Sequence, residues 1–245
     1  MCVFNICYIM FNPSEFVSFL KKPQYEGIER KYTNVLFTAI KIYLLALLII
    51  GLISSLSTII LRTFIDLPID ETLIIPVTFK DHLWNYFILV AFISPLLEEV
   101  IFRLSLVFNP VNISLSISTL TALIVHKISN GIISIIAFIL IYIVINLLAF
   151  IYKSNFQSFW SKNFKYIFYS LSILFGLVHI SNYNFLEAYQ YFIIPILIFP
   201  QLAIGFILSF TRIYYKKGFL ICFIIHVLMN MVSVTISLLE YSHGS

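Results

Sequence analysis

The sequence predicts an all-α protein, a polytopic bundle of about seven transmembrane helices with a polar site inside the membrane. Hydrophobic residues make up 61% of the 245 residues and charged residues only 11%, whereas a soluble domain is about 45–50% apolar and about 25% charged. This composition excludes both a soluble globule and a disordered chain. The apolar residues form long unbroken runs, which favours helices over the strict alternation of a membrane β-barrel.

The apolar runs are long enough to cross a bilayer, which takes about 20 residues of helix. The predicted spans are residues 36–61, 83–104, 113–125, 132–152, 166–180, 191–210 and 219–239. Span 113–125 is shorter than a full crossing, so the sequence leaves open whether it crosses. We expect residues 1–35 to form a cytoplasmic or interfacial segment and residues 36–245 to form a single transmembrane bundle.

The distribution of Lys and Arg predicts a cytoplasmic N-terminus, because short cytoplasmic loops carry an excess of basic residues. The longest polar connections are residues 62–82 and 153–165. Abundant Ile, Phe, Lys and Asn is typical of an AT-rich bacterial genome, so we expect a bacterial inner (plasma) membrane. The basic residues are scattered, which gives no indication of a nucleic-acid partner. The predicted cytoplasmic set is Lys21, Lys22, Arg30, Lys31, Lys153, Lys162, Lys165, Arg212, Lys216 and Lys217, and the outer set is Arg62, Lys80 and Lys127.

Three of the spans contain polar side chains that a membrane helix normally excludes. Each ionisable residue inside a span costs about 2.5–3.5 kcal/mol on insertion scales, so it is a functional hypothesis by default. The least costly arrangement buries these side chains against one another around one water-filled cavity. The residues are Glu98, Glu99 and Arg103 in the second span, His179 in the fifth, and His226 and Asn230 in the seventh.

Helical spacing assigns different tasks to the two glutamates. Glu99 and Arg103 are four residues apart, so they share a helix face and can pair. Glu98 is rotated by about 100° from Glu99 and has no partner on its own helix. An unpaired carboxylate in an apolar span suits a general base or acid. Pro95 removes a backbone hydrogen bond just before it, which would bend the helix and make room for water.

The histidines also have neighbours at helical spacing. Phe175 can pack beside His179, and His226 shares a face with Asn230, so that their N–H groups could stabilise a developing oxyanion. Each of these residues alone has a simpler explanation. The Glu99–Arg103 pair can be structural, and a single histidine or asparagine can be an interhelical hydrogen bonder. The combination of all of them at these spacings favours a shared site.

These motifs resemble the CPBP family of intramembrane proteases, which includes the eukaryotic CAAX prenyl endopeptidase and the bacterial Abi proteins. The family is marked by Glu-Glu-x-x-x-Arg, then Phe-x-x-x-His, then His-x-x-x-Asn. This chain has them in that order, as Glu98-Glu99-Val-Ile-Phe-Arg103, Phe175-Gly-Leu-Val-His179 and His226-Val-Leu-Met-Asn230. The resemblance covers about residues 93–232.

The resemblance implies an endopeptidase that cleaves a peptide or a membrane-protein segment with an activated water. Glu98 would be the general base and His179 would orient the water. His226 and Asn230 would stabilise the oxyanion, while Glu99, Arg103 and Phe175 would support the site. The resemblance leaves the cofactor open between none and a zinc ion held by Glu98, His179 and His226.

The chain departs from the family pattern in the distance between the first two motifs. Glu98 and His179 are separated by 80 intervening residues, or about 81 positions, and residues 113–152 look like an inserted helical pair. His179 also lies about 13 residues past Tyr166, or about 20 Å along a helix, so it is expected deeper than Glu98 unless its span is tilted or begins near Trp160.

Two other functions are consistent with the sequence. The polar cluster could hold helices together in a non-proteolytic membrane partner, such as a bacteriocin-immunity factor or a sensor-kinase regulator. A proton-coupled transporter also uses buried carboxylates, but it usually shows two related halves with broken helices. No such repeat is visible in this sequence.

Overall fold

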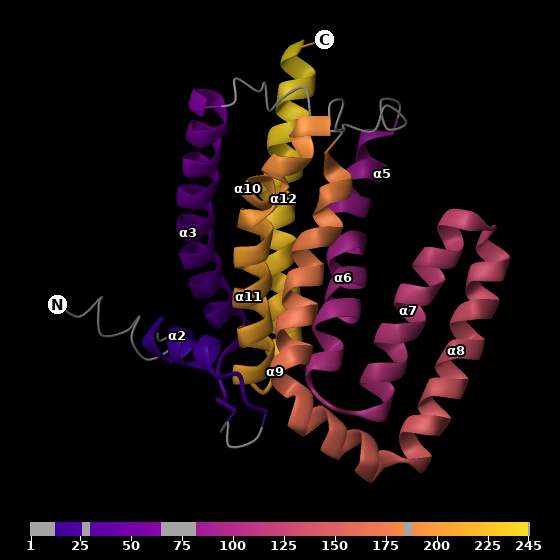
Figure 1. Cartoon of the computed structure of the whole chain (residues 1–245). Helices are drawn as coiled ribbons and strands as arrows, with labels where there is room; N and C mark the ends of the chain where they lie inside the picture. Colours follow the sequence, from indigo (N-terminus) through magenta and orange to yellow (C-terminus); the bar gives the residue numbers. More distant parts are fainter. Residues whose placement is uncertain (1–12, 26–29, 65–81, 184–187, 245) are drawn as a thin grey trace.

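The computed structural model describes residues 13–25, 30–64, 82–183 and 188–244, and within these ranges the chain is helical with no β-strand (Figure 1). This agrees with the predicted all-α class. The predicted N-terminal residues 1–12 and the loop residues 65–81, which include Lys80, lie outside the described ranges. The elements are α2 (Pro13–Lys21), α3 (Val35–Phe64), α5 (Leu83–Ile88), η2 (Leu89–Ile93), α6 (Ser94–Phe102), η3 (Leu104–Leu106), α7 (Pro110–Ile128), α8 (Gly131–Ile151), α9 (Lys153–Val178), η4 (His179–Asn182), η5 (Ala188–Ile193), α10 (Ile194–Leu197), α11 (Phe199–Tyr214) and α12 (Gly218–Gly244).

Among the described residues, five helices are long and apolar enough to cross a membrane: α3, α7, α8, α9 and α12. A sixth crossing results if η5–α10 and α11 act as one span, which bends by 42° between them. The chain is therefore compatible with an integral membrane protein. The predicted second span, 83–104, is divided among α5, η2 and α6, which are individually too short for this test. The count of about seven thus stays a prediction.

The start of α9 corrects one sequence prediction. Residues 153–165 were expected to be a polar connection, but they form the first turns of α9. Phe164 and Phe168 are buried there and continue the buried face that includes Ser172 and Phe175. Residues 153–159 are exposed on all sides of the helix, so these first turns have the composition of a polar connection. Helix α7 is likewise longer than the predicted span 113–125.

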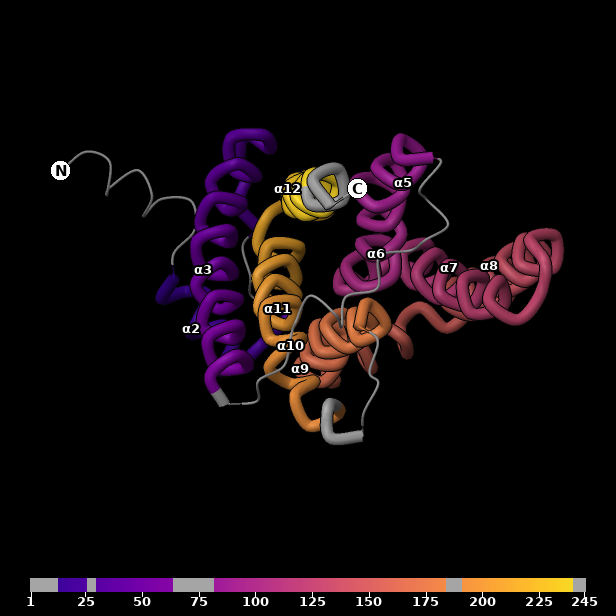
Figure 2. Tube along the Cα trace, turned by 90° about the horizontal axis from the view of Figure 1, so that it is seen from above, coloured from indigo at the N-terminus to yellow at the C-terminus, as the bar shows by residue number. Residues whose placement is uncertain are grey.

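The helices form a central bundle with one hairpin at its side. Helices α3, α11 and α12 pack together, and α12 also packs against η2 and α6, while α11 packs against α9 (Figure 2). The α7–α8 hairpin lies beside α6 and α9, as Figure 1 shows, and α8 packs chiefly against α7. The interpretation of residues 113–152 as an inserted helical pair stays a prediction.

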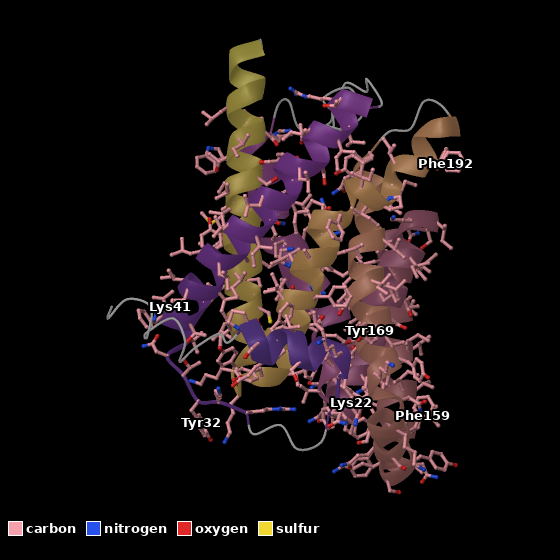
Figure 3. The ribbon with its side chains drawn as sticks, turned by 60° about the vertical axis from the view of Figure 1, so that its left-hand side comes forward. Lys22, Tyr32, Lys41, Phe159, Tyr169 and Phe192 are labelled. Atoms are coloured by element: carbon pink, nitrogen blue, oxygen red, sulfur yellow. The ribbon has the colours of Figure 1, made fainter. Side chains whose placement is uncertain are left out.

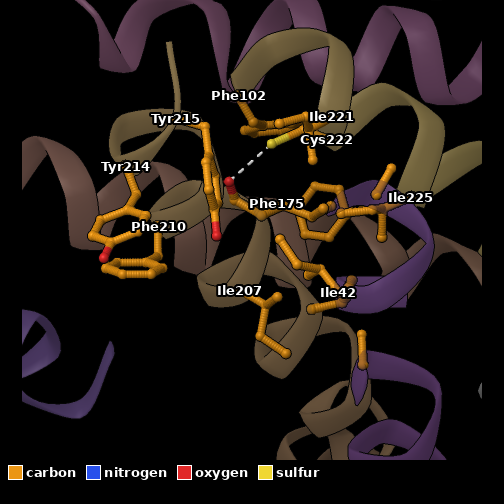
Figure 4. Packing of buried hydrophobic residues seen from close by; sticks show 14 of the residues in the cluster. Ile42, Phe102, Phe175, Ile207, Phe210, Tyr214, Tyr215, Ile221, Cys222 and Ile225 are labelled. Atoms are coloured by element: carbon orange, nitrogen blue, oxygen red, sulfur yellow. Dashed lines mark hydrogen bonds between the residues drawn. The ribbon is translucent and has the colours of Figure 1, made fainter. Parts of the chain in front are cut away.

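The buried centre of the bundle connects helices that are far apart in sequence. Figure 4 shows the largest apolar cluster, in which Ile42 of α3, Phe102 of α6, Phe175 of α9 and Ile225 of α12 pack around α11. Phe102 and Phe175 meet edge to face with ring centroids 5.7 Å apart. The cluster fixes α6, α9 and α12 relative to one another, and these are the helices that carry the candidate site.

The short helix α2 is held against the end of the bundle by aromatic contacts. Phe16 and Phe19 pack on the Phe210 ring, with centroids 5.3 Å apart in each pair, and Phe19 also packs edge to face on Phe168. The Tyr169 hydroxyl donates to the carbonyl of Leu20. Figure 3 shows α2 lying across the bundle next to Tyr169. The prediction that this segment is cytoplasmic or interfacial stays a prediction.

Helices α9 and α11 approach closely at a pair of small residues. The Ser172 hydroxyl donates to the Ser209 hydroxyl at 2.9 Å, and one turn earlier α11 has Gly205. A Cβ at Gly205 would lie 2.9 Å from the carbonyl oxygen of Ser172 and 3.0 Å from the Phe175 ring. No side chain therefore fits at Gly205 without a shift of α9.

We predict that Gly205→Ala lowers the stability of the detergent-purified protein by about 1–3 kcal/mol, the usual cost of an overpacked core. The control is Gly51→Ala in α3, where a Cβ would meet nothing within 4 Å. That change should be neutral or slightly stabilising, because alanine favours a helix by about 0.5–1 kcal/mol over glycine. Thermal unfolding compares the two, and equal melting temperatures for both variants would contradict the close approach.

Candidate active site

The structure brings five of the polar residues singled out in the sequence into one cluster. Glu98 and Glu99 lie in α6, and Arg103 is the residue that ends it. His179 is the first residue after α9, and His226 lies in the first third of α12. The sequence placed His179 deeper than Glu98. The structure removes this mismatch, because the first turns of α9 extend beyond the end of α6 (Figure 1) and its far end reaches Glu98.

One carboxylate oxygen of Glu98 faces both histidines. Its Oε2 is 3.8 Å from Nε2 of His179 and 3.7 Å from Nε2 of His226. This oxygen is buried and has no hydrogen-bond partner within the part of the chain that the structure describes. The Glu98 side chain as a whole remains 24% exposed and that of His179 18% exposed. The cluster is thus partly exposed at Glu98 and His179, while the carboxylate oxygen between the two histidines is buried.

Hydrogen bonds at the other ring nitrogens orient both imidazoles. Nδ1 of His179 is 2.8 Å from the carbonyl oxygen of Phe175, which can only accept, so Nδ1 carries the hydrogen. Nδ1 of His226 is 2.9 Å from Oε1 of Glu99, and it donates to that carboxylate. In the neutral ring the lone pair then lies on Nε2. Both lone pairs are therefore directed toward Glu98.

Glu99 has a second partner that the sequence did not reveal. It was expected to pair with Arg103, and the structure places Arg103 Nε 3.7 Å from its Oε2, with both side chains fully buried. The contact with His226 comes from a helix 127 positions away. Spacing along one helix predicts the first contact and carries no information about the second. Glu99 therefore links the structural ion pair to the candidate catalytic histidine.

Phe175 contacts every cationic or imidazole group of the cluster. Its ring centroid is 5.0 Å from that of His179 and 5.5 Å from that of His226, the latter edge to face. The Arg103 guanidinium carbon lies 3.9 Å from the same ring centroid. This cation–π contact matters because the three guanidinium nitrogens of Arg103 are buried without a hydrogen bond among the described residues. The expected packing of Phe175 beside His179 is confirmed.

Asn230 contacts a part of the second span that precedes the two glutamates. The sequence expectation paired it with His226 as an oxyanion donor. In the structure its Nδ2 donates to the carbonyl oxygen of Val90 in η2 at 2.9 Å. One amide hydrogen is thereby engaged, which leaves the second for a bound group.

Arg212 is a supporting residue that sequence reasoning missed. It was assigned to a cytoplasmic loop, but it lies in the last turn of α11 and is only 7% exposed. Its Nε donates to the carbonyl oxygen of Arg103 at 3.0 Å, where α6 ends. A basic residue near a helix end is a topology signal in the sequence, and nothing in that pattern distinguishes it from a buried cap.

The side chains do not fit the zinc site that the resemblance left open. Within the described ranges, no three His, Cys, Asp or Glu side chains are arranged to hold a metal ion. Glu98, His179 and His226 therefore do not form such a group, although their polar atoms converge. The chemistry that these residues support is therefore derived from the side chains alone.

Comparisons of the chain with protein-family models, with curated proteins and with solved structures found no match.

We predict that Arg103→Leu lowers the free energy of unfolding by about 3–5 kcal/mol, because it leaves the buried Glu99 without its cation. Lys165→Leu is the control, since Lys165 is an exposed cation on α9 and a surface change of this kind is usually within about 0.5 kcal/mol. Denaturant or thermal unfolding in detergent measures both. If Arg103→Leu unfolds no more easily than Lys165→Leu, the ion pair is not the support described above.

Proposed function

We propose that this protein is an intramembrane endopeptidase of the CPBP type, which hydrolyses a peptide bond with a water activated by Glu98. The observation that carries the proposal is the convergence of Glu98 Oε2 with Nε2 of His179 and Nε2 of His226, at 3.8 and 3.7 Å. These separations exceed a hydrogen bond and suit groups bridged by a water molecule. A carboxylate and two imidazole lone pairs all accept hydrogen bonds, and a bound water can donate to two of these three groups at a time.

In the proposed reaction Glu98 accepts a proton from the water, and the resulting hydroxide attacks the carbonyl carbon of the scissile bond. His179 holds the water in place through Nε2, since its Nδ1 is fixed by the Phe175 carbonyl. As the tetrahedral intermediate breaks, the proton on Glu98 passes to the leaving nitrogen and the C–N bond cleaves. One water is consumed, and a carboxylic acid and an amine are formed.

The negative charge that develops on the carbonyl oxygen needs donors. In the resting site Nε2 of His226 accepts a hydrogen bond, so it can donate to this oxygen only by sharing the proton that Glu98 takes from the water, 3.7 Å away. The 2.9 Å contact of Nδ1 with Glu99 would stabilise the ring that shares this proton. This is the role that a buried carboxylate has toward histidine in hydrolase triads. Glu99 then serves both the fold and the reaction.

The proposed substrate is a peptide or a membrane-protein segment that reaches the site laterally from the bilayer or from the cytoplasm. The partial exposure of Glu98 and His179 supports such access. The Lys and Arg distribution supports a cytoplasmic N-terminus, and the composition supports a bacterial inner membrane. A prenylated substrate does not follow, because the resemblance is limited to the catalytic motifs.

The alternative is a non-proteolytic membrane partner in which the same residues hold the helices together. The complete burial of Glu99 and Arg103 is compatible with this alternative, since both side chains contribute to packing whether or not cleavage occurs. It does not account for the partly exposed Glu98, which has no cation among the contacts that the structure shows.

We predict that purified protein cleaves members of a quenched peptide library and that Glu98→Gln reduces the rate by about 10²–10⁴-fold, the range for loss of a general base. Glutamine is nearly isosteric and cannot accept the proton. Glu15→Gln is the matched control, because Glu15 lies in α2, where it contacts Tyr214 and Lys31, distant from the cluster in sequence and on a different element. Its cleavage rate should equal that of the wild type.

The assay is run with and without a zinc chelator. Activity that survives the chelator and is lost in Glu98→Gln supports a water activated by glutamate. Loss under both conditions would show that a metal takes part, which the side-chain arrangement does not predict. A folded wild type without any cleavage would contradict the proposal and leave the partner protein as the better account.

A further inference from the structure

The side-chain amide of Asn230 contacts the backbone of another helix at an irregular point. Residues Leu89–Ile93 form a turn of π-helix, η2, between α5 and α6. Asn230 in α12 donates from Nδ2 to the carbonyl oxygen of Val90 within this turn, at 2.9 Å. Turns of π-helix are rare and occur mostly at functional sites. Glu98 lies about one and a half turns further along the same run of helix.

The hydrogen-bond register explains why the Val90 carbonyl needs a donor from outside. At the end of η2 the backbone N–H of Ser94 donates to the carbonyl of Leu89, five residues back. In this register the next donor, for the carbonyl of Val90, is residue 95. That residue is Pro95, which has no N–H. The proline therefore removes the regular main-chain partner of Val90.

An unsatisfied carbonyl is costly in a membrane, where water is not at hand to replace the missing donor. Neighbouring helices and polar side chains are the groups that make a proline tolerable in such a position. Asn230 is one such group, and it comes from the helix that also carries His226, one turn earlier. Pro95 removes a donor from the Val90 carbonyl and Asn230 replaces it, although the two residues are 135 positions apart in the sequence.

We propose that Asn230 is a positioning residue for Glu98: its amide replaces the hydrogen bond lost at Pro95 and fixes the register of α6 against α12. The bond lies one turn from His226 on α12 and about two turns from Glu98 on the other helix. It therefore sets the height at which Glu98 Oε2 faces His226 Nε2, now 3.7 Å away. This inference rests on the proposed function for its effect on catalysis, while the bond itself is independent of it.

The test is a double-mutant cycle between Asn230→Ala and Pro95→Ala. Alanine at position 95 restores a backbone N–H. The Val90 carbonyl can then accept a hydrogen bond from the main chain and no longer needs the Asn230 side-chain amide. We expect Asn230→Ala to lower the melting temperature by about 2–4 °C with Pro95 present, and by less than about 1 °C in the Pro95→Ala background. Pro200→Ala is the matched control background, because Pro200 lies in the first turn of α11, where no helical donor is needed.

Catalysis is measured in the same four proteins. With Pro95 we expect Asn230→Ala to lower kcat by about tenfold or more with KM little changed, since a small misplacement of a reacting group is costly. In the Pro95→Ala background the loss should be less than about threefold, because the two changes remove the same coupling. An equal loss of kcat and of melting temperature in both backgrounds would overturn the proposal, because Asn230 would then act independently of Pro95. In the Pro200→Ala background the effect of Asn230→Ala must remain as large as in the wild type.

A second variant keeps the proposal falsifiable if the Pro95→Ala protein does not fold. Asn230→Asp is isosteric but places carboxylate oxygens against the Val90 carbonyl, so it should melt below Asn230→Ala. A melting temperature equal to or above that of Asn230→Ala would overturn the inference. Because melting requires no substrate, these results remain decisive even if no peptide is cleaved, and failure of the proposed function is thereby separate from failure of this inference.

Discussion

The arrangement of the whole molecule depends on the requirement that a charge inside a membrane be paired. Arg103 is fully buried, with Glu99 at 3.7 Å and the Phe175 ring at 3.9 Å as its compensating groups. The contact with Phe175 ties the end of α6 to α9, and the Glu99–His226 hydrogen bond ties α6 to α12. Replacing water around a buried ion costs several kcal/mol unless such partners are present. These contacts therefore fix where α6, α9 and α12 pack against one another. As a consequence, the unpaired Glu98 lies between the two histidines.

The same requirement extends to the backbone. The π-turn at Leu89–Ile93 and Pro95 leave a carbonyl without its regular donor, and Asn230 supplies one. Where α6 ends, Arg212 supplies a donor to the carbonyl of Arg103. In both places a side chain from another helix satisfies a group that lipid cannot. These two hydrogen bonds stabilise the bundle and also restrict the positions of Glu98 and Glu99. The same bonds therefore serve both the fold and the proposed catalysis.

Sequence patterns predicted what depends on a single helix and missed what depends on two. Apolar runs identified the helices, and a spacing of four residues identified the Glu99–Arg103 pair and the packing of Phe175 on His179. The meeting of Glu98 with both histidines followed only from the cost of burying them separately. The Glu99–His226 and Asn230–Val90 bonds join positions more than 120 residues apart, and periodicity holds no information about them. Residues 153–165 at the start of α9 were predicted as a connection, because their Lys, Ser and Asn residues are also typical of a polar loop.

The central claim is that both imidazoles present Nε2 to Glu98 while Nδ1 is hydrogen-bonded. It is tested most directly by nitrogen NMR of the detergent-purified protein labelled with ¹⁵N-histidine, with His179→Gln and His226→Gln to assign the signals. The account predicts that both rings carry their hydrogen on Nδ1 in the neutral form, and that Glu98→Gln shifts both Nε2 resonances while that of His126 stays unchanged. Hydrogens on Nε2 in both rings, or Nε2 resonances that do not shift in Glu98→Gln, would contradict the central claim.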